Sequence, residues 1–325
     1  MNDDTGLVRL GAAVFGAMVV IGAIARLLGV DPKGHDGGGD DPPAAQALLG
    51  DTLAAADTLL DCELDAPPVE LPAAVHEASG LALSRRMPGL LWTHSDAGDP
   101  QVLAVDSSGT MRGSVRLTGA TVVNWEDLAV GPCPAGTCLY VADIGDNEAS
   151  RPEITIYRLP EPDPTTTSAA PAEALQASYP DGRHDAEAMF VDAAGRIHVV
   201  TKGETGSIAV YRFPEDAAPG RAATLERLAV LSDESVRRPE RITGASASAD
   251  GRLVALRTLT SLAIYPVAAL TSGPAADAQR FDVAAADEAQ GEGVALGEGG
   301  IVYLASEGGS RKKPATLARM TCPLR

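Results

Sequence analysis

Basic and aromatic residues are scarce in this chain. Lysine and arginine number 26 against 44 aspartates and glutamates, so the formal net charge is −18, and aromatic residues make up 4% of the 325 residues. A protein without a basic stripe cannot displace the counterions of a phosphate backbone, and one without aromatic platforms cannot stack bases. The composition therefore argues against nucleic acid as a partner.

Nucleophile motifs are missing and cysteines are few. The chain has no Gly-x-Ser-x-Gly elbow, and its four cysteines fit disulfides in an oxidising compartment. Cys133 and Cys138 flank a tight turn, which favours a local disulfide and leaves Cys62 and Cys322. A metal site is the alternative, but no Cys-x-x-Cys pair or nearby histidine supports it.

Near its start the chain carries one long apolar run, Leu10–Ala25, which Arg26 ends. As a helix this run would span about 24 Å, which is short of a hydrocarbon core of about 30 Å. Residues 7–30 could cross a membrane if Arg26 snorkels, whereas residues 23–25 could instead be the cleavage site of a secretory signal. Residues 1–30 are therefore predicted to be a membrane anchor or a signal peptide, and both send the rest of the chain out of the cytoplasm.

Residues 31–60 read as a connecting segment. Gly34–Pro43 is rich in glycine and aspartate, a composition that cannot build a core. Residues 44–60 are rich in alanine and leucine and could form a short helix. We therefore expect one folded domain over residues 61–325.

A repeated strand pattern predicts the fold of that domain. Three similar segments carry Tyr157, Tyr211 and Tyr265, so the step from one tyrosine to the next is 54 residues both times. A fixed step of this size is typical of a propeller or a solenoid. Alignment of the units gives five repeats of up to four strands with short hairpin turns, which predicts an all-β, five-bladed β-propeller. A six-bladed ring is the alternative.

The fifth unit ends after its third strand, at Cys322. Its fourth strand must come from elsewhere, and the segment from Cys62 to Leu71 is unassigned just before the first unit. We predict that this N-terminal segment completes the last blade and that a disulfide between Cys62 and Cys322 locks the ring. In the chain-entropy model a bond closing so long a loop contributes about 4–5 kcal/mol.

Polar residues recur where each first strand begins. They form two columns, one with Glu77, Asn124, Asp185, Arg241 and Gln290 and the other with Ser79, Glu126, Glu187, Thr243 and Glu292. The columns differ by two positions, so both point the same way along a strand, which in a propeller is toward the central channel. The second strands end at the same face with further polar residues, among them Asp96, Asp143, Asn147, Lys202, Arg257 and Glu307. One mouth of the channel is therefore predicted to be acidic.

A ring of carboxylates is costly unless cations neutralise it. Ca²⁺, a hard cation that prefers oxygen ligands, would do so. The predicted metal ligands are Glu77, Glu126, Asp143, Asp185, Glu187 and Glu292. Internal salt bridges to basic residues are the alternative, and the candidate anion or substrate residues are Asp96, Asn147, Lys202, Arg241, Arg257 and Glu307. His94 and His184 are weak candidates for proton transfer beside a metal.

Several of these segments together resemble a known group of proteins. They are Glu77–Leu81, Trp92–Asp96, Trp125–Ala129, Asp143–Asn147, Asp185–Ala188 and Gln290–Val294. Over roughly residues 70–322 the chain resembles bacterial extracytoplasmic β-propeller proteins whose functions are mostly unassigned, and more remotely the "esterase-like activity of phytase" and SdiA-regulated propeller families. The resemblance implies a calcium-bearing channel mouth at the acidic positions and implies no substrate.

Two functions follow as expectations. The first is a monomeric extracytoplasmic binding or scaffold propeller, with a protein or small molecule as its ligand and with the membrane as a partner if the N-terminal helix is not cleaved. The second is a calcium-dependent hydrolase of esters, lactones or phosphoesters. Lys202, Arg241 and Arg257 are the only basic residues placed near the site, which weakens the case for a phosphoesterase.

Overall fold

The computed structural model describes residues 59–75, 77–272, 277–308 and 313–324. The anchor or signal predicted for residues 1–30 and nearly all of the predicted linker lie outside the described residues. Within these ranges the chain is built from β-strands, with one short α-helix, α1 (Val267–Thr271). The described part contains no helix that is both long and apolar enough to cross a membrane.

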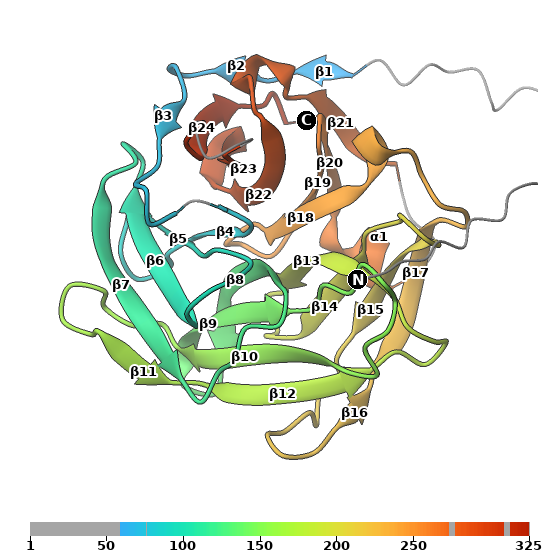
Figure 1. The fold of residues 1–325 in the computed structure, drawn as a ribbon. Helices are drawn as coiled ribbons and strands as arrows, with labels where there is room; N and C mark the ends of the chain where they lie inside the picture. Colours follow the sequence, from blue (N-terminus) through green and yellow to red (C-terminus); the bar gives the residue numbers. More distant parts are fainter. Residues whose placement is uncertain (1–58, 76, 273–276, 309–312, 325) are drawn as a thin grey trace, which may run out of the picture. The chain divides into compact units, whose positions relative to one another are not determined.

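The strands form five blades around a common axis, and consecutive strands in a blade pair antiparallel (Figure 1). Blade 1 contains β4 (Leu81–Leu83), β5 (Leu90–Thr93), β6 (Gln101–Asp106) and β7 (Met111–Thr118). Blade 2 contains β8 (Trp125–Cys133), β9 (Gly136–Asp143), β10 (Ile154–Pro160) and β12 (Glu173–Ser178). Blade 3 contains β13 (Ala186–Val191), β14 (Ile197–Thr201), β15 (Ile208–Arg212) and β17 (Glu226–Ser232). The five-bladed prediction is confirmed.

The last two blades show how the ring closes. Blade 4 contains β18 (Ile242–Ala247), β19 (Leu253–Thr258), β20 (Ser261–Pro266) and β21 (Gln279–Asp282). Blade 5 contains β22 (Gln290–Leu296), β23 (Ile301–Glu307) and β24 (Thr316–Thr321). Its outer edge is supplied by β2 (Glu63–Leu64) and β3 (Val69–Glu70), which both pair antiparallel with β24. The blue N-terminal segment follows this edge in Figure 1.

Two disulfides confirm the predicted cysteine pairing. Cys62 is bonded to Cys322, which joins the N-terminal segment to the end of β24, and Cys133 is bonded to Cys138 across the hairpin of β8 and β9. The closure predicted from the incomplete fifth repeat is therefore confirmed. Because disulfides persist in oxidising compartments, both bonds indicate an extracytoplasmic environment for the folded chain.

Three short strands extend neighbouring blades, and the sequence did not predict them. They are β11 (Ala169–Pro171), β16 (Ala223–Thr224) and β1 (Leu60–Asp61), which pair parallel with β7, β12 and β21 respectively. Each has two or three residues, too few to show an alternating pattern. Their pairing ties one blade to another along the outer rim.

The repeated tyrosines occupy one structural position. Each lies on the third strand of its blade opposite a valine of the second strand, in the pairs Tyr157–Val141, Tyr211–Val199 and Tyr265–Val254. All three tyrosines are buried. The step of 54 residues therefore measures one blade, and the ring packs through the same contact each time.

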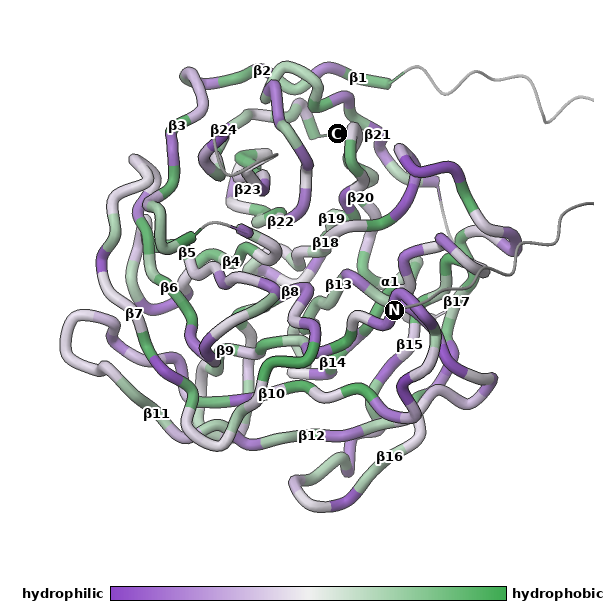
Figure 2. The backbone as a smooth tube through the Cα atoms, viewed as in Figure 1, coloured by the Kyte–Doolittle hydropathy of each residue, from purple (hydrophilic) through white to green (hydrophobic). Residues whose placement is uncertain are grey.

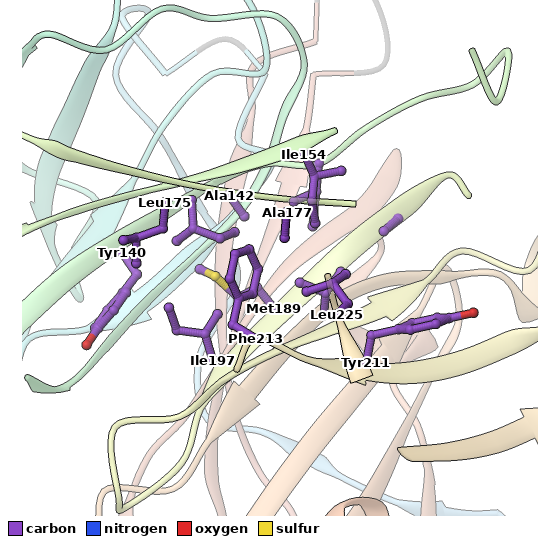
Figure 3. Packing of buried hydrophobic residues seen from close by; sticks show 14 of the residues in the cluster. Tyr140, Ala142, Ile154, Leu175, Ala177, Met189, Ile197, Tyr211, Phe213 and Leu225 are labelled. Carbon is purple, nitrogen blue, oxygen red and sulfur yellow. The ribbon is translucent and has the colours of Figure 1, made fainter. Parts of the chain in front are cut away.

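The hydrophobic core lies between blades. Buried apolar residues form five clusters in the described part, one for each pair of neighbouring blades. Figure 3 shows the cluster between blades 2 and 3, where Leu175 and Ile154 of blade 2 lie near Met189 and Phe213 of blade 3. In Figure 2 hydrophobic stretches run within the blades, whereas many connecting loops are hydrophilic.

Around the axis the innermost strands touch one another directly. A Cβ atom on Gly80 would lie 2.8 Å from the backbone nitrogen of Leu128 in the next blade, and one on Gly293 would lie 2.8 Å from the carbonyl carbon of Gly80. Such distances exclude a side chain, so glycine at these positions lets the blades close tightly. The axis is thus packed in its middle and leaves two separate mouths, one on each face of the ring.

Candidate functional site

β-Bulges in four of the five innermost strands turn the predicted polar column toward the axis. In blade 2, Trp125 pairs with Asp143 and Asp127 pairs with Ala142, so Glu126 is the extra residue. The extra residues in blades 3 and 4 are Glu187 and Thr243, and blade 5 has the same irregularity at Glu292 and Gly293. A bulge re-aims the side chain it carries, which explains why these positions face the channel.

We define the acidic mouth by the charged and amide residues that gather at this face. They are Glu77, Asp96, Glu126, Asp185, Glu187, Lys202, Glu204, Arg241, Gln290, Glu292 and Glu307. Blades 3, 4 and 5 converge there on a cavity of about 110 Å³, lined among others by Glu187, Lys202, Thr243 and Glu292. The glutamates Glu126, Glu187 and Glu292 are 9%, 8% and 7% exposed, so each carboxyl is largely withdrawn from water.

One half of the mouth is neutralised by basic side chains, and we call it the Lys202 half. The Lys202 ammonium forms an ion pair with Glu187 and lies 3.4 Å from Asp185 Oδ2 and 3.3 Å from Glu204 Oε2. The second basic residue is Arg241, whose Nη1 is 2.7 Å from Glu204 Oε1. Burial acts to lower the pKa of Lys202, but Glu187, Asp185 and Glu204 outweigh it and raise this pKa. Lys202 therefore stays charged.

The carboxyls near Lys202 still resist ionisation. Burial raises the pKa of Glu187 to about 7, although Lys202 acts in the opposite sense. Burial and the charges of Glu187 and Asp185 raise the pKa of Glu126 well above its usual range. One ammonium is thus shared among more carboxyls than it can neutralise, as expected for like charges in a confined site.

The other half of the mouth is formed by blades 1 and 5, and we call it the Glu307 half. Gln290 Nε2 donates to Glu292 Oε1 at 2.7 Å and to Glu307 Oε2 at 3.1 Å. Burial and the charges of Asp96 and Glu77 raise the pKa of Glu307 to about 7. Burial and the charges of Glu187 and Glu307 raise the pKa of Glu292 to about 8.

Blade 1 contributes a pair of carboxyls to the Glu307 half. Burial, a hydrogen bond with Glu77 and the charge of Glu77 raise the pKa of Asp96 to about 6. Within the described ranges, no lysine or arginine forms an ion pair with Asp96, Glu292 or Glu307. Among the contacts of the described residues, this half is connected by the hydrogen bond of Asp96 with Glu77 and by the two hydrogen bonds that Gln290 donates.

Two predicted site residues, one at the end of β9 and one in the loop after it, have other partners. Asp143 lies 2.8 Å from Arg151 Nη1, and it accepts hydrogen bonds from the backbone nitrogens of Val123 and Asn124. Asn147 is exposed and accepts a hydrogen bond from Lys202 at 3.2 Å. Asp143 thus orders the loop that precedes the bulge of blade 2, and Asn147 reaches the edge of the Lys202 half.

Arg257 joins two blades. Its fully buried guanidinium donates to the carbonyl oxygens of Gly293 at 2.6 Å and Ala305 at 2.9 Å, and it pairs with Glu288. Arg257 was predicted as an anion ligand. In the structure its guanidinium instead binds groups of the protein and connects blade 4 to blade 5. The sequence did not identify Glu288, which lies in a loop outside the repeat.

The two candidate histidines occupy different surroundings. His94 has no exposed surface, lies edge-on to Trp125 and has its pKa lowered by burial to about 4. His184 Nε2 lies 2.9 Å from Asp181 Oδ1 and 3.2 Å from the hydroxyl of Tyr211. His94 is therefore buried within electrostatic reach of Asp96 at the mouth, whereas the hydrogen-bond partners of His184 lie outside the defined mouth.

A residue that sequence reasoning missed closes the channel below the mouth. Asp127 is fully buried, and its carboxylate accepts hydrogen bonds from the backbone nitrogens of Leu128, Met189 and Ala245. These amides belong to the innermost strands of blades 2, 3 and 4. An acidic residue directly before the apolar run 128–130 was the available signal. Glu204, also missed, follows Lys202 by two positions.

No three aspartate, glutamate, histidine or cysteine side chains of the described residues already surround a point closely enough to hold a metal ion. The donors that Ca²⁺ prefers, carboxylate and amide oxygens, are nevertheless the groups present in the Glu307 half. The donor chemistry fits the ion, and calcium binding stays a prediction.

Comparison with known proteins finds remote structural likeness alone. No protein-family profile and no curated protein sequence matches the chain. Among solved structures it is similar to the PQQ-bound aldose sugar dehydrogenase of Streptomyces coelicolor, with 13% identity and a TM-score of 0.48 over 80% of this chain and 98% of that one. A gluconolactonase from Xanthomonas campestris shares 12% identity with a TM-score of 0.39, over 79% and 96% of the two chains. Likeness at this level carries no information about fold, ligand or reaction.

Proposed function

We propose that this chain is an extracytoplasmic binding propeller whose acidic mouth takes Ca²⁺ in the Glu307 half. The observation that carries the proposal is the contrast between the two halves of the mouth. Lys202 and Arg241 neutralise one half, whereas the carboxyls of Glu292 and Glu307 have no ion-pair partner among the described residues. A cation there would relieve the repulsion that now raises their pKa values.

The ligands would be the carboxylates of blades 1 and 5 together with the amide oxygen of Gln290. Gln290 now donates its amino group to both glutamates, and rotation of the amide would present its oxygen instead. Because Glu292 and Glu307 retain protons near neutral pH, cation binding would release protons. A bound cation supplies a positive centre at the mouth for an oxygen group of a small molecule or protein partner.

The test is a calcium titration of protein that has been treated with a chelator. We expect Ca²⁺ to raise the melting temperature, by about 5 °C at a hundredfold excess over Kd, since mass action then contributes about 2.7 kcal/mol. The double variant Glu292→Gln, Glu307→Gln should lose this shift. Glu298→Gln, which changes an exposed glutamate at the opposite mouth, is the matched control and should keep it.

Calorimetry in buffers of different ionisation enthalpy adds a second readout, because it counts the protons released on binding. An unchanged melting temperature at millimolar Ca²⁺ would contradict the proposal, and so would an equal shift in the double variant. A panel of ester, lactone and phosphoester substrates tests the hydrolase alternative. Turnover that disappears in the double variant would favour that alternative.

A further inference from the structure

The opposite face of the ring has its own hollow on the axis. A cavity of about 320 Å³ opens where the innermost strands end, and all five blades contribute to it. Its walls are mostly aliphatic, with Leu83, Leu128, Val191, Ala245 and Leu296 from the five blades in turn. We call this hollow the apolar mouth. Its size and lining are typical of a site for a small ligand, in which apolar walls surround a few polar groups.

One guanidinium in this cavity forms neither a hydrogen bond nor an ion pair among the described residues. Arg85 lines the cavity, is half-buried, and forms no hydrogen bond or ion pair within the described part of the chain. Its neighbour Arg86 points elsewhere and donates to the carbonyl oxygen of Glu161. Burial lowers the pKa of Arg85, while the charges of Glu161 and Tyr140 act in the opposite sense. A partly desolvated, unpaired guanidinium is a strong site for a carboxylate, which it can bind through two parallel hydrogen bonds.

Two serine hydroxyls in the lining of the cavity add donors. Ser84 Oγ accepts hydrogen bonds from the backbone nitrogens of Arg86 and Met87, and Ser246 Oγ accepts one from Leu296. Both serines line the cavity. Since each oxygen already accepts a backbone N–H, each hydroxyl hydrogen remains able to donate to an anion.

The cavity continues toward blades 4 and 5. A second hollow of about 880 Å³ shares Leu296, Gly297 and Glu298 with it and reaches Leu253 and Leu324. A ligand whose charged end lies at Arg85 could therefore extend an apolar tail into this groove. The Glu298 carboxylate at the shared rim is exposed and forms no ion pair among the described residues, so it disfavours a second negative charge there.

We propose that the apolar mouth binds a small apolar molecule that carries one carboxylate, with the carboxylate on Arg85 and the apolar body against the aliphatic walls. The site uses none of the acidic-mouth residues and is independent of the function proposed above.

Isothermal titration calorimetry with octanoate, octan-1-ol and octylammonium tests this proposal on the purified propeller. Octanoate should bind at least tenfold more tightly than octan-1-ol, and octylammonium should bind more weakly than octanoate. Arg85→Gln should weaken the binding of octanoate about tenfold, because the charged contact is lost. The affinity for octan-1-ol should stay unchanged, since this ligand carries no charge. Arg116→Gln, which changes an exposed arginine on β7, is the matched control and should have no effect.

A filling variant, in which a larger side chain takes up space in the cavity, tests whether the ligand binds there. Ala247→Leu places bulk in the cavity and should weaken octanoate and octan-1-ol alike, and Ala249→Leu serves if the first variant does not fold. The proposal is overturned if octanoate gives no binding heat at millimolar concentration or if octylammonium binds as tightly. It is also overturned if Arg85→Gln behaves like Arg116→Gln, or if a folded filling variant keeps full affinity.

Discussion

The two mouths of this propeller are made by the same five strands and are chemically opposite. At the acidic mouth, four of the innermost strands carry bulges that turn Glu126, Glu187, Thr243 and Glu292 toward the axis. At the apolar mouth those strands keep regular pairing, and small or aliphatic residues such as Ala129 and Ala247 surround the axis. The difference shows that a local change of register, repeated around the ring, decides which face becomes polar.

Asp127 separates the two mouths. Its carboxylate is buried, and burial raises its pKa although the three backbone amides that it accepts from act in the opposite sense. Below the acidic mouth, Asp127 therefore forms part of the buried core of the ring. Asp127 and the charged groups of the acidic mouth contribute to stability through different interactions, and the changes below address each in turn.

The largest effect on the free energy of unfolding is expected from removing the Asp127 carboxyl group. Asp127→Ala leaves three buried backbone amides in three blades without an acceptor, and each such loss costs about 1–3 kcal/mol. We expect the free energy of unfolding to fall by about 4 kcal/mol in urea titrations. Asp127→Asn keeps one acceptor oxygen, so its free energy of unfolding should fall by less than that of Asp127→Ala. A loss under about 1 kcal/mol in Asp127→Ala would show that the two mouths do not depend on this residue.

The next effect comes from the acidic mouth itself. Lys202→Met removes the ammonium shared by Asp185, Glu187 and Glu204, and breaking a buried ion pair costs about 3–5 kcal/mol. Because Lys202 keeps some exposure, we expect the lower end, about 3 kcal/mol at pH 8. The loss should be smaller at pH 5, where the carboxyls bind protons.

The exposed Arg221, in the loop after β15, provides the control for this change, because Arg221→Met removes one positive charge from a residue whose ion-pair partner, Asp216, lies outside the mouth. It should leave the free energy of unfolding nearly unchanged at both pH values. Equal destabilisation by Lys202→Met at pH 5 and pH 8 would contradict the view that uncompensated carboxylates cause it.

Most of the architecture could be predicted from the sequence because it repeats. The tyrosine step, the short hairpin turns and the missing fourth strand of the last unit fixed five blades and the latch between Cys62 and Cys322, and the structure confirms them. The polar column could be predicted because its members share one position in each unit. The bulges that turn it toward the axis could not, since a bulge depends on the partner strand.

Contacts between blades lie outside what a repeat can predict. Asp127 binds amides of Met189 and Ala245, 62 and 118 residues away, and Arg257 pairs with Glu288 in a loop. Nothing in the local pattern joins such residues. The sequence placed most of the acidic-mouth residues at one end of the strands but missed Glu204, and it could not show which of the described carboxyls form ion pairs with Lys202.

The smallest expected effect is the pH dependence of the free energy of unfolding that the carboxyls of the acidic mouth cause. In the folded chain the pKa of Glu292 is raised to about 8, and those of Glu187 and Glu307 to about 7, from an ordinary value of 4.5. The folded state therefore keeps protons that the unfolded state has lost, so its stability must fall as pH rises through these values. We expect a loss of about 2 kcal/mol between pH 6.5 and 8.5.

This window also avoids the buried histidines. Burial lowers the pKa of His94 and His198 to about 4, so these residues reduce stability only below their ordinary value of 6.5, where the unfolded chain begins to bind protons. Urea titrations across the window should therefore report the acidic mouth together with Asp127, whose pKa is also raised by burial. Glu292→Gln should flatten the slope, and Glu298→Gln at the apolar mouth should leave it unchanged. The interpretation is wrong if the free energy of unfolding rises with pH across this window. It is also wrong if both variants flatten the pH dependence equally, because the acidic mouth would then not be its source.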